Sequence, residues 1–133
     1  MAVTKSGVKR EQPTKSVVAK SIKRGEIYWV KLPLSSKQSK IRELQGPHPC
    51  LVVSNDEQNH FSPLITILPL TSSIDKIYPF QVLTELKGRN SVILVDQIRT
   101  LDRKRFGARV EEASIEMMEE VERALHITLA LKS

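Results

Sequence analysis

A histidine and a cluster of hydroxyls are the residues whose types and spacing could do chemistry, and both lie between positions 45 and 73. His48 precedes an apolar run at 50–53, and a second apolar run covers 64–70. Apolar runs of four to eight residues bounded by turn residues are typical of buried strands. The second run ends at three consecutive hydroxyl side chains: Thr71, Ser72 and Ser73.

An antiparallel pairing of these two strands would bring His48 close to Thr71, because the start of one strand then lies beside the end of the other. Hydroxyls can donate hydrogen bonds, and histidine changes charge near neutral pH, so the pair would suit a phosphate. The simpler interpretations are an ordinary, partly buried loop histidine and a set of strand-end caps. The residues alone leave both interpretations open.

The whole net charge of this 133-residue chain lies in its first 24 residues. They hold seven of the 21 basic residues and one of the 15 acidic residues, so they carry the net charge of +6 and the remainder is neutral. We expect residues 1–22 to be a disordered basic arm. On composition alone a solvated extension without function is favoured. The alternatives are an arm that strengthens nucleic-acid binding without specificity and, less favoured, a transit peptide. Residues 23–133 are then one globular domain.

Cysteine and histidine spacing argue against a disulfide or a metal cofactor. Cys50 is the only cysteine, and its place in an apolar run predicts a buried thiol in a reducing compartment, which we expect to be the cytoplasm. His48, His60 and His126 are too widely spaced to indicate a metal site. No apolar segment is long enough to span a bilayer, and no signal-peptide core is visible, so no membrane association is expected.

About five strands are predicted from apolar runs and turn residues. A hairpin turn at 87–90, with Gly88 at its centre, joins the last two of them. The segments 56–63 and 74–79 are predicted as polar connections, and a long polar loop at 35–45 could overhang the histidine. The predicted strands cover residues 25–32, 50–53, 64–70, 80–86 and 91–98, the last extended through 100.

A helix is predicted from Ser114 onward. Serine is a good N-cap, and acidic residues in the first turns complement the helix dipole. Apolar residues at spacings of three and four form a stripe that is wide enough to support a dimer contact as well as the core. The stripe consists of Ile115, Met118, Val121, Leu125 and Leu129, and it is widened by Met117, Ala124, Thr128 and Leu131.

Short strands in series followed by one helix predict a mainly β fold, a small antiparallel barrel with the C-terminal helix packed against it (α+β). No alternation of strands with helices appears along the chain. A parallel sheet is therefore not expected.

The chain resembles the MazF/PemK toxins of bacterial toxin–antitoxin systems. The resemblance covers nearly all of 23–131 and is specific because several motifs recur in order. These are RGEIYWVKL (24–32), GPHPCLVVSND (46–56), FSPLITILPLTSS (61–73), SVILVDQIRTLDRKRF (91–106) and the helix from Ser114. It implies an SH3-like β-barrel, a homodimer, and metal-independent cleavage of single-stranded RNA (mRNA) at short motifs by 2′-OH attack. It also implies a partner antitoxin whose tail occupies the RNA groove, with DNA contacted only through the antitoxin complex.

The resemblance assigns site residues by position. The family's catalytic threonine falls on Thr71, while the arginine that usually precedes the proline of the second motif is replaced by His48. His48 cannot offer an arginine's fork to two phosphate oxygens, although it can donate or accept a proton. Residues expected to contact RNA are Glu43, Ser72, Ser73, Gln97 and Arg99.

Two of these assignments have structural alternatives. Arg99, if it lies near, could restore the missing positive charge, but Gln97 and Arg99 could also be a structural pair inside the barrel. The basic residues 103–105 are more often a solvated turn than a phosphate track.

The leading functional hypothesis is a sequence-specific endoribonuclease toxin. A homologue that binds RNA or an antitoxin without efficient cleavage is the alternative, because His48 replaces the family arginine. A toxin of the same barrel type that inhibits DNA gyrase is less favoured, since Thr71 and the DQIRT segment (96–100) are retained.

Overall fold

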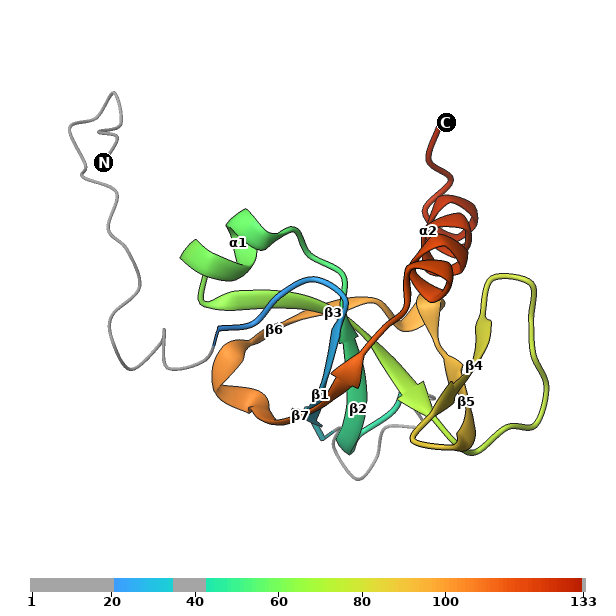
Figure 1. Ribbon diagram of the computed structural model, residues 1–133, viewed down its shortest axis with the longest axis horizontal. Coiled ribbons are helices and arrows are strands. Elements are labelled where there is room, and N and C mark those ends of the chain that lie inside the picture. Colours follow the sequence, from blue (N-terminus) through green and yellow to red (C-terminus); the bar gives the residue numbers. More distant parts are fainter. Residues whose placement is uncertain (1–20, 35–42, 133) are drawn as a thin grey trace.

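A computed structural model describes residues 21–34 and 43–132 (Figure 1). Nearly all of the predicted basic arm and most of the loop at 35–45 lie outside these residues. Ile22, which the prediction assigns to the arm, is buried in the core.

Seven strands form one antiparallel sheet in the described part of the chain (Figure 1). Neighbouring strands follow the order β4-β5-β3-β2-β1-β7, and β6 pairs with the first half of β3. The predicted mainly antiparallel fold with a C-terminal helix is confirmed. The strands are β1 (Glu26–Leu32), β2 (Gly46–Val52), β3 (Leu64–Thr71), β4 (Val82–Leu86), β5 (Arg89–Ile93), β6 (Arg99–Asp102) and β7 (Phe106–Glu112).

The central strands are buried on both faces, which explains their nearly continuous apolar sequence. Successive side chains of a strand point to opposite faces of the sheet. One face of the sheet packs with Val121 and Ala124 of the helix α2 (Ile115–Thr128), and the other packs around Phe106. The first core takes Ile27, Leu51, Leu68 and Leu70 from β1, β2 and β3, and the second takes Val30, Cys50, Val52 and Ile67.

The prediction of a single strand at 91–98, extended through 100, is wrong. Two separate strands occupy this region, β5 and β6, with a one-turn 3-10 helix at Val95–Gln97 between them. β5 pairs with the end of β3 and β6 pairs with its beginning, so the chain has to step along β3 between the two pairings. A local apolar pattern does not show this step. The step depends on which part of β3 pairs with β5 and which part pairs with β6.

Two elements of the fold were not predicted. The segment 56–63 contains a short helix, α1 (Asp56–Phe61), whose N-cap Asn55 accepts a hydrogen bond from the Gln58 amide at 2.8 Å. β7 was missed because it is an edge strand with several exposed or charged residues and no clean alternation. None of the helices in the described residues is long and apolar enough to cross a membrane.

Arg103 is buried, in contrast to the prediction of a solvated turn at 103–105. Its guanidinium donates to the carbonyl oxygens of Asn59 and Ser62, which ties the end of α1 to the turn before β7. Burial lowers the pKa of Arg103. The side chain therefore stabilises the local fold and is not available to track phosphates.

The helix α2 begins after Ser114, as predicted, but its buried stripe is narrower than expected. Val121 and Ala124 are its buried residues. Met118 and Leu125 are half-buried against the core, whereas Ile115 and Leu129 are 76% and 47% exposed. The two ends of the predicted stripe therefore face away from the barrel.

Ser114→Ala should lower the free energy of unfolding by about 1 kcal/mol, which is typical for loss of an N-cap. The Ser114 hydroxyl oxygen accepts a hydrogen bond from the Met117 amide at 3.1 Å, and alanine leaves that amide without its acceptor. Urea denaturation would measure the difference. Ser114→Asp should retain the stability, and a loss equal to that of the alanine variant would show that the cap is not the cause.

Candidate active-site groove

One groove of about 770 Å³ collects the histidine and the hydroxyl cluster. Its walls come from β1, the start of β2, the end of β3, the β4–β5 hairpin and the middle of β7. The polar residues that line it are His48, Thr71, Ser72, Ser73, Lys87, Arg89, Ser91 and Arg109, and Trp29 is among the apolar ones.

His48 is held on a short stretch of β2 that is paired on one side. β1 pairs with β2 along its whole length, including Val30 opposite His48, but the pairing of β3 with β2 begins only at Cys50. The residue before a proline is restricted to extended backbone, and Pro49 follows His48 directly. The half-buried His48 is therefore presented at the open side of β2, in the groove.

Thr71 ends β3 on the other side of this opening. The register Cys50↔Pro69, continued by two residues, places Thr71 opposite His48. The Thr71 Oγ1 atom accepts a hydrogen bond from the Ser73 amide at 3.1 Å, so its own O–H remains available as a donor. The structure thus brings His48 and Thr71 into one groove, as the antiparallel pairing predicts.

Glu43, Gln97 and Arg99 form a different cluster. The Gln97 Oε1 atom accepts from the Leu44 amide at 2.9 Å, and an Arg99 terminal nitrogen donates to the Leu44 carbonyl at 3.1 Å. The other terminal nitrogen of Arg99 lies 3.7 Å from the Glu43 carboxylate. None of the three lines the groove, and Gln97 and Arg99 hold the segment that enters β2, in agreement with the structural alternative.

A family model of the PemK-like, MazF-like toxins of type II toxin–antitoxin systems matches residues 23–129. The chain belongs to this family.

Similar proteins include a relative named as an endoribonuclease and solved structures of MazF. "Endoribonuclease EndoA" of Bacillus subtilis (strain 168) is 38% identical over 117 residues, which cover 83% of this chain and 96% of the relative. MazF from Deinococcus radiodurans superimposes with a TM-score of 0.70 at 29% identity, over 84% of this chain and 99% of that one. A MazE–MazF structure from the same organism gives a TM-score of 0.68 at 29% identity, over 85% and 99%.

The basic wall of the groove in this MazF-like chain was missed at the sequence level. Lys87 and Gly88 form a two-residue hairpin loop with φ values of 50° and 78°, and Arg89 is the first residue of β5 after it. Positive φ at both loop positions is the mark of the tight hairpin that was predicted at 87–90. The available signal was therefore the hairpin itself, because its geometry decides where Arg89 points.

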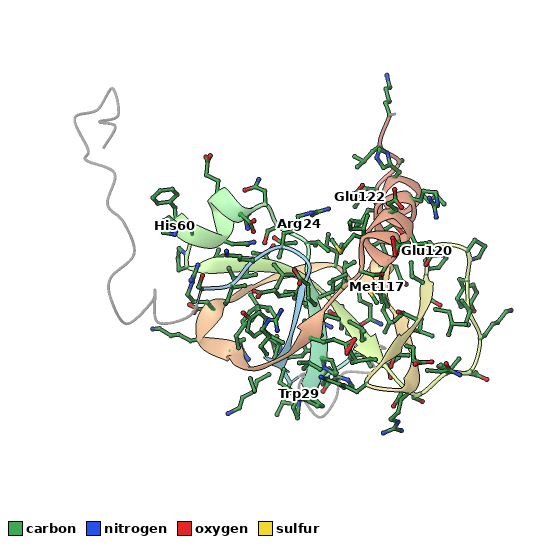
Figure 2. The ribbon with its side chains drawn as sticks, in the orientation of Figure 1. Arg24, Trp29, His60, Met117, Glu120 and Glu122 are labelled. Atoms are coloured by element: carbon green, nitrogen blue, oxygen red, sulfur yellow. The ribbon has the colours of Figure 1, made fainter. Side chains whose placement is uncertain are left out.

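Trp29 lines the groove and is labelled at the lower edge of Figure 2. Arg24, whose guanidinium is 3.0 Å from Glu122 of α2, is labelled in the upper part of the same view. His60 lies on α1, apart from both, so it is separate from the groove that holds His48.

Cys50 lies next to this site, but its thiol is not suited to act as a nucleophile. Its side chain is fully buried, and burial raises the pKa of the thiol to about 12. The thiol therefore stays protonated at neutral pH. Within residues 21–34 and 43–132, no group of three or more His, Cys, Asp or Glu side chains is arranged to hold a metal ion.

Proposed function

We propose that this MazF-like protein is the toxin of a toxin–antitoxin system and cleaves single-stranded RNA at short sequence motifs without a metal ion. The observation that carries the proposal is the groove that both His48 and Thr71 line. Membership of the toxin family and the 38% identity to a protein named endoribonuclease support it.

The chemistry of such a cleavage fits the groove's side chains. The 2′-oxygen of the ribose attacks the neighbouring phosphorus, and the bond from phosphorus to the 5′-oxygen breaks. A base takes the 2′-OH proton, an acid protonates the leaving 5′-oxygen, and hydrogen-bond donors stabilise the charge on the phosphoryl oxygens. His48 is suited to one of the two proton transfers, and the Thr71 O–H to donation. We infer that Ser72 and Ser73, which line the same groove, contact the adjoining RNA.

Incubation of the purified protein with a long single-stranded RNA in EDTA tests the proposal. Discrete fragments are expected, because cleavage is specific for short motifs and needs no metal. Intact RNA that shifts on a gel would instead identify a protein that binds without cutting, and intact RNA without a shift would exclude RNA as the ligand of this groove.

An antitoxin is the expected protein partner, because the family is defined by toxin–antitoxin pairs. The antitoxin's tail would compete with RNA for the groove, and any contact with DNA would be made through the toxin–antitoxin complex. We place the protein's action in the cytoplasm, where mRNA is translated. Addition of the antitoxin should then abolish the cleavage seen in EDTA.

We further propose that the protein forms a homodimer. The two ends of α2 and the residues just after it carry large exposed apolar side chains, which favours contact with a second copy. These are Ile115, Ile127, Leu129 and Leu131, each 47% exposed or more. Light scattering at micromolar concentration should give twice the 15.1 kDa chain mass, and a monomer under these conditions would contradict the proposal.

A further inference from the structure

Cleavage in this groove needs a positive charge close to the phosphate, and His48 supplies no permanent one. A guanidinium suits this task because its planar fork binds two phosphate oxygens and keeps its charge at every relevant pH. Arg99 was the residue expected to restore the charge. Its terminal nitrogens are engaged by Leu44, Gln97 and Glu43, and it does not line the groove.

The seven arginines of the described residues, Arg99 included, can be sorted by the groups that their side chains bind. Five have partners within the described residues. Arg24 binds Glu122, Arg99 binds Leu44, Arg103 binds Asn59 and Ser62, Arg105 binds the Lys31 carbonyl, and Arg109 binds Glu26 at 2.9 Å. Arg89 and Arg123 make no side-chain hydrogen bond or ion pair to the described part of the chain. Arg89 lines the groove, whereas Arg123 lies on α2 beside a separate hollow.

Strand pairing brings Arg89 to the wall of the groove. β5 runs antiparallel to the end of β3, with Ile93 opposite Leu70 and Val92 opposite Thr71. Alternate residues of a strand share a face, so Arg89 and Ser91 lie on the face of Leu70, and all three line the groove together with Thr71. Three residues of strand cover about 10 Å, a separation that an extended arginine side chain can largely span. The exposed guanidinium thus stands at the groove wall within the strand that adjoins Thr71.

We propose that Arg89 is the phosphate-binding residue of this groove. Its guanidinium binds the non-bridging oxygens of the RNA backbone, which leaves His48 free for proton transfer. The inference rests on the proposed function, in that the ligand is a phosphodiester of single-stranded RNA. In this arrangement Arg89 of β5 supplies the positive charge, and His48 of β2 supplies the ring that donates or accepts a proton.

Three variants test the inference in the full-length chain. Arg89→Met should lower kcat/KM for a long RNA in EDTA by about tenfold to a hundredfold, as expected for loss of hydrogen bonds to a charged group. Arg89→Lys should recover only part of this loss, because an ammonium keeps the charge but not the fork. Arg123→Met, the matched control with the same change of charge, should leave kcat/KM unchanged. Thermal melting should show the same stability for the two methionine variants.

The decisive comparison repeats Arg89→Met in the presence of His48→Arg. A guanidinium at position 48 would already bind the phosphate, so loss of Arg89 should then cost less than about threefold. A merely structural role of Arg89 would give the same loss with either residue at position 48. Equal losses in the two backgrounds, or an Arg89→Met variant as active as Arg123→Met, would overturn the inference while leaving the endoribonuclease intact.

A parent protein that does not cleave RNA would refute the proposed function and not the phosphate site. Fluorescence anisotropy with a 2′-O-methylated single-stranded RNA of mixed sequence then decides. Binding that Arg89→Met weakens about tenfold more than Arg123→Met would support Arg89 as the phosphate-binding residue. Equal binding by the two variants, or no binding by the parent, would overturn it.

Discussion

His48→Ala should slow RNA cleavage by about a hundredfold or more, the usual cost of losing a general acid or base. His48 is the only histidine among the described residues that line the groove, and it stands opposite Thr71 when the β2–β3 register is continued. The rate of the parent should also depend on pH between about 5 and 8, where histidine ordinarily changes charge. A rate that rises with pH would identify His48 as the base, and a rate that falls would identify it as the acid.

Other buried groups should not contribute to that pH profile. The pKa of Cys50 is raised to about 12 by burial, and the pKa of Tyr28 is raised to about 12 by burial and by its hydrogen bond to Glu26. Both groups therefore stay protonated from pH 5 to 8.

Two variants serve as controls for His48. His60→Ala should be as active as the parent, because His60 lies on α1 outside the groove. His48→Arg should flatten the pH dependence between 5 and 8, since arginine does not titrate there. If His48→Ala cleaves RNA as fast as His60→Ala, His48 has no part in proton transfer.

Thr71→Val should lower kcat about a hundredfold, comparable with the removal of one donor to a developing oxyanion. Valine keeps the size and shape of the side chain but removes the O–H that we propose donates to a phosphoryl oxygen. It also removes the acceptor of the Ser73 amide, so part of the loss reflects the turn at the end of β3. Thr71→Ser restores both hydrogen bonds and should recover most of the activity.

Thr100→Val is the matched control for this substitution. The Thr100 hydroxyl pairs with Thr66 at 2.8 Å on the surface formed by β3 and β6, and neither residue lines the groove. Its loss should leave kcat unchanged. A Thr71→Val variant with the activity of Thr100→Val would show that the Thr71 hydroxyl does not act in the reaction.

The parts of the site that could be predicted depend on local apolar runs with turn residues and on the pairing of β2 with β3. Two apolar runs with turn residues at their ends define β2 and β3, and an antiparallel pairing between them suffices to join His48 with Thr71. The tight hairpin after Leu86 was also evident, because glycine at its centre permits positive φ. These features are local or require a single long-range contact.

The parts that could not be predicted depend on register between distant strands. Arg99 follows an apolar run and carries a positive charge, but its pairing with Ile67 of β3 turns its side chain toward Leu44 instead of the groove. Arg89 was not predicted as a site residue, because the hairpin that precedes it was evident but the strand with which β5 pairs was not. It reaches the groove because β5 pairs with the end of β3, a contact separated by about twenty residues.

A substrate with one changed atom tests the account most directly. Once the cleavage site has been mapped, an RNA oligonucleotide with a single 2′-deoxy nucleotide immediately 5′ to the scissile phosphate is incubated with the protein in EDTA, beside the all-ribose oligonucleotide. The account predicts that the all-ribose RNA is cut and that the deoxy-substituted RNA stays intact at that position, because its 2′-oxygen nucleophile is absent. Cleavage of both substrates at the same phosphate would contradict attack by the 2′-OH and with it the roles proposed for His48 and Thr71.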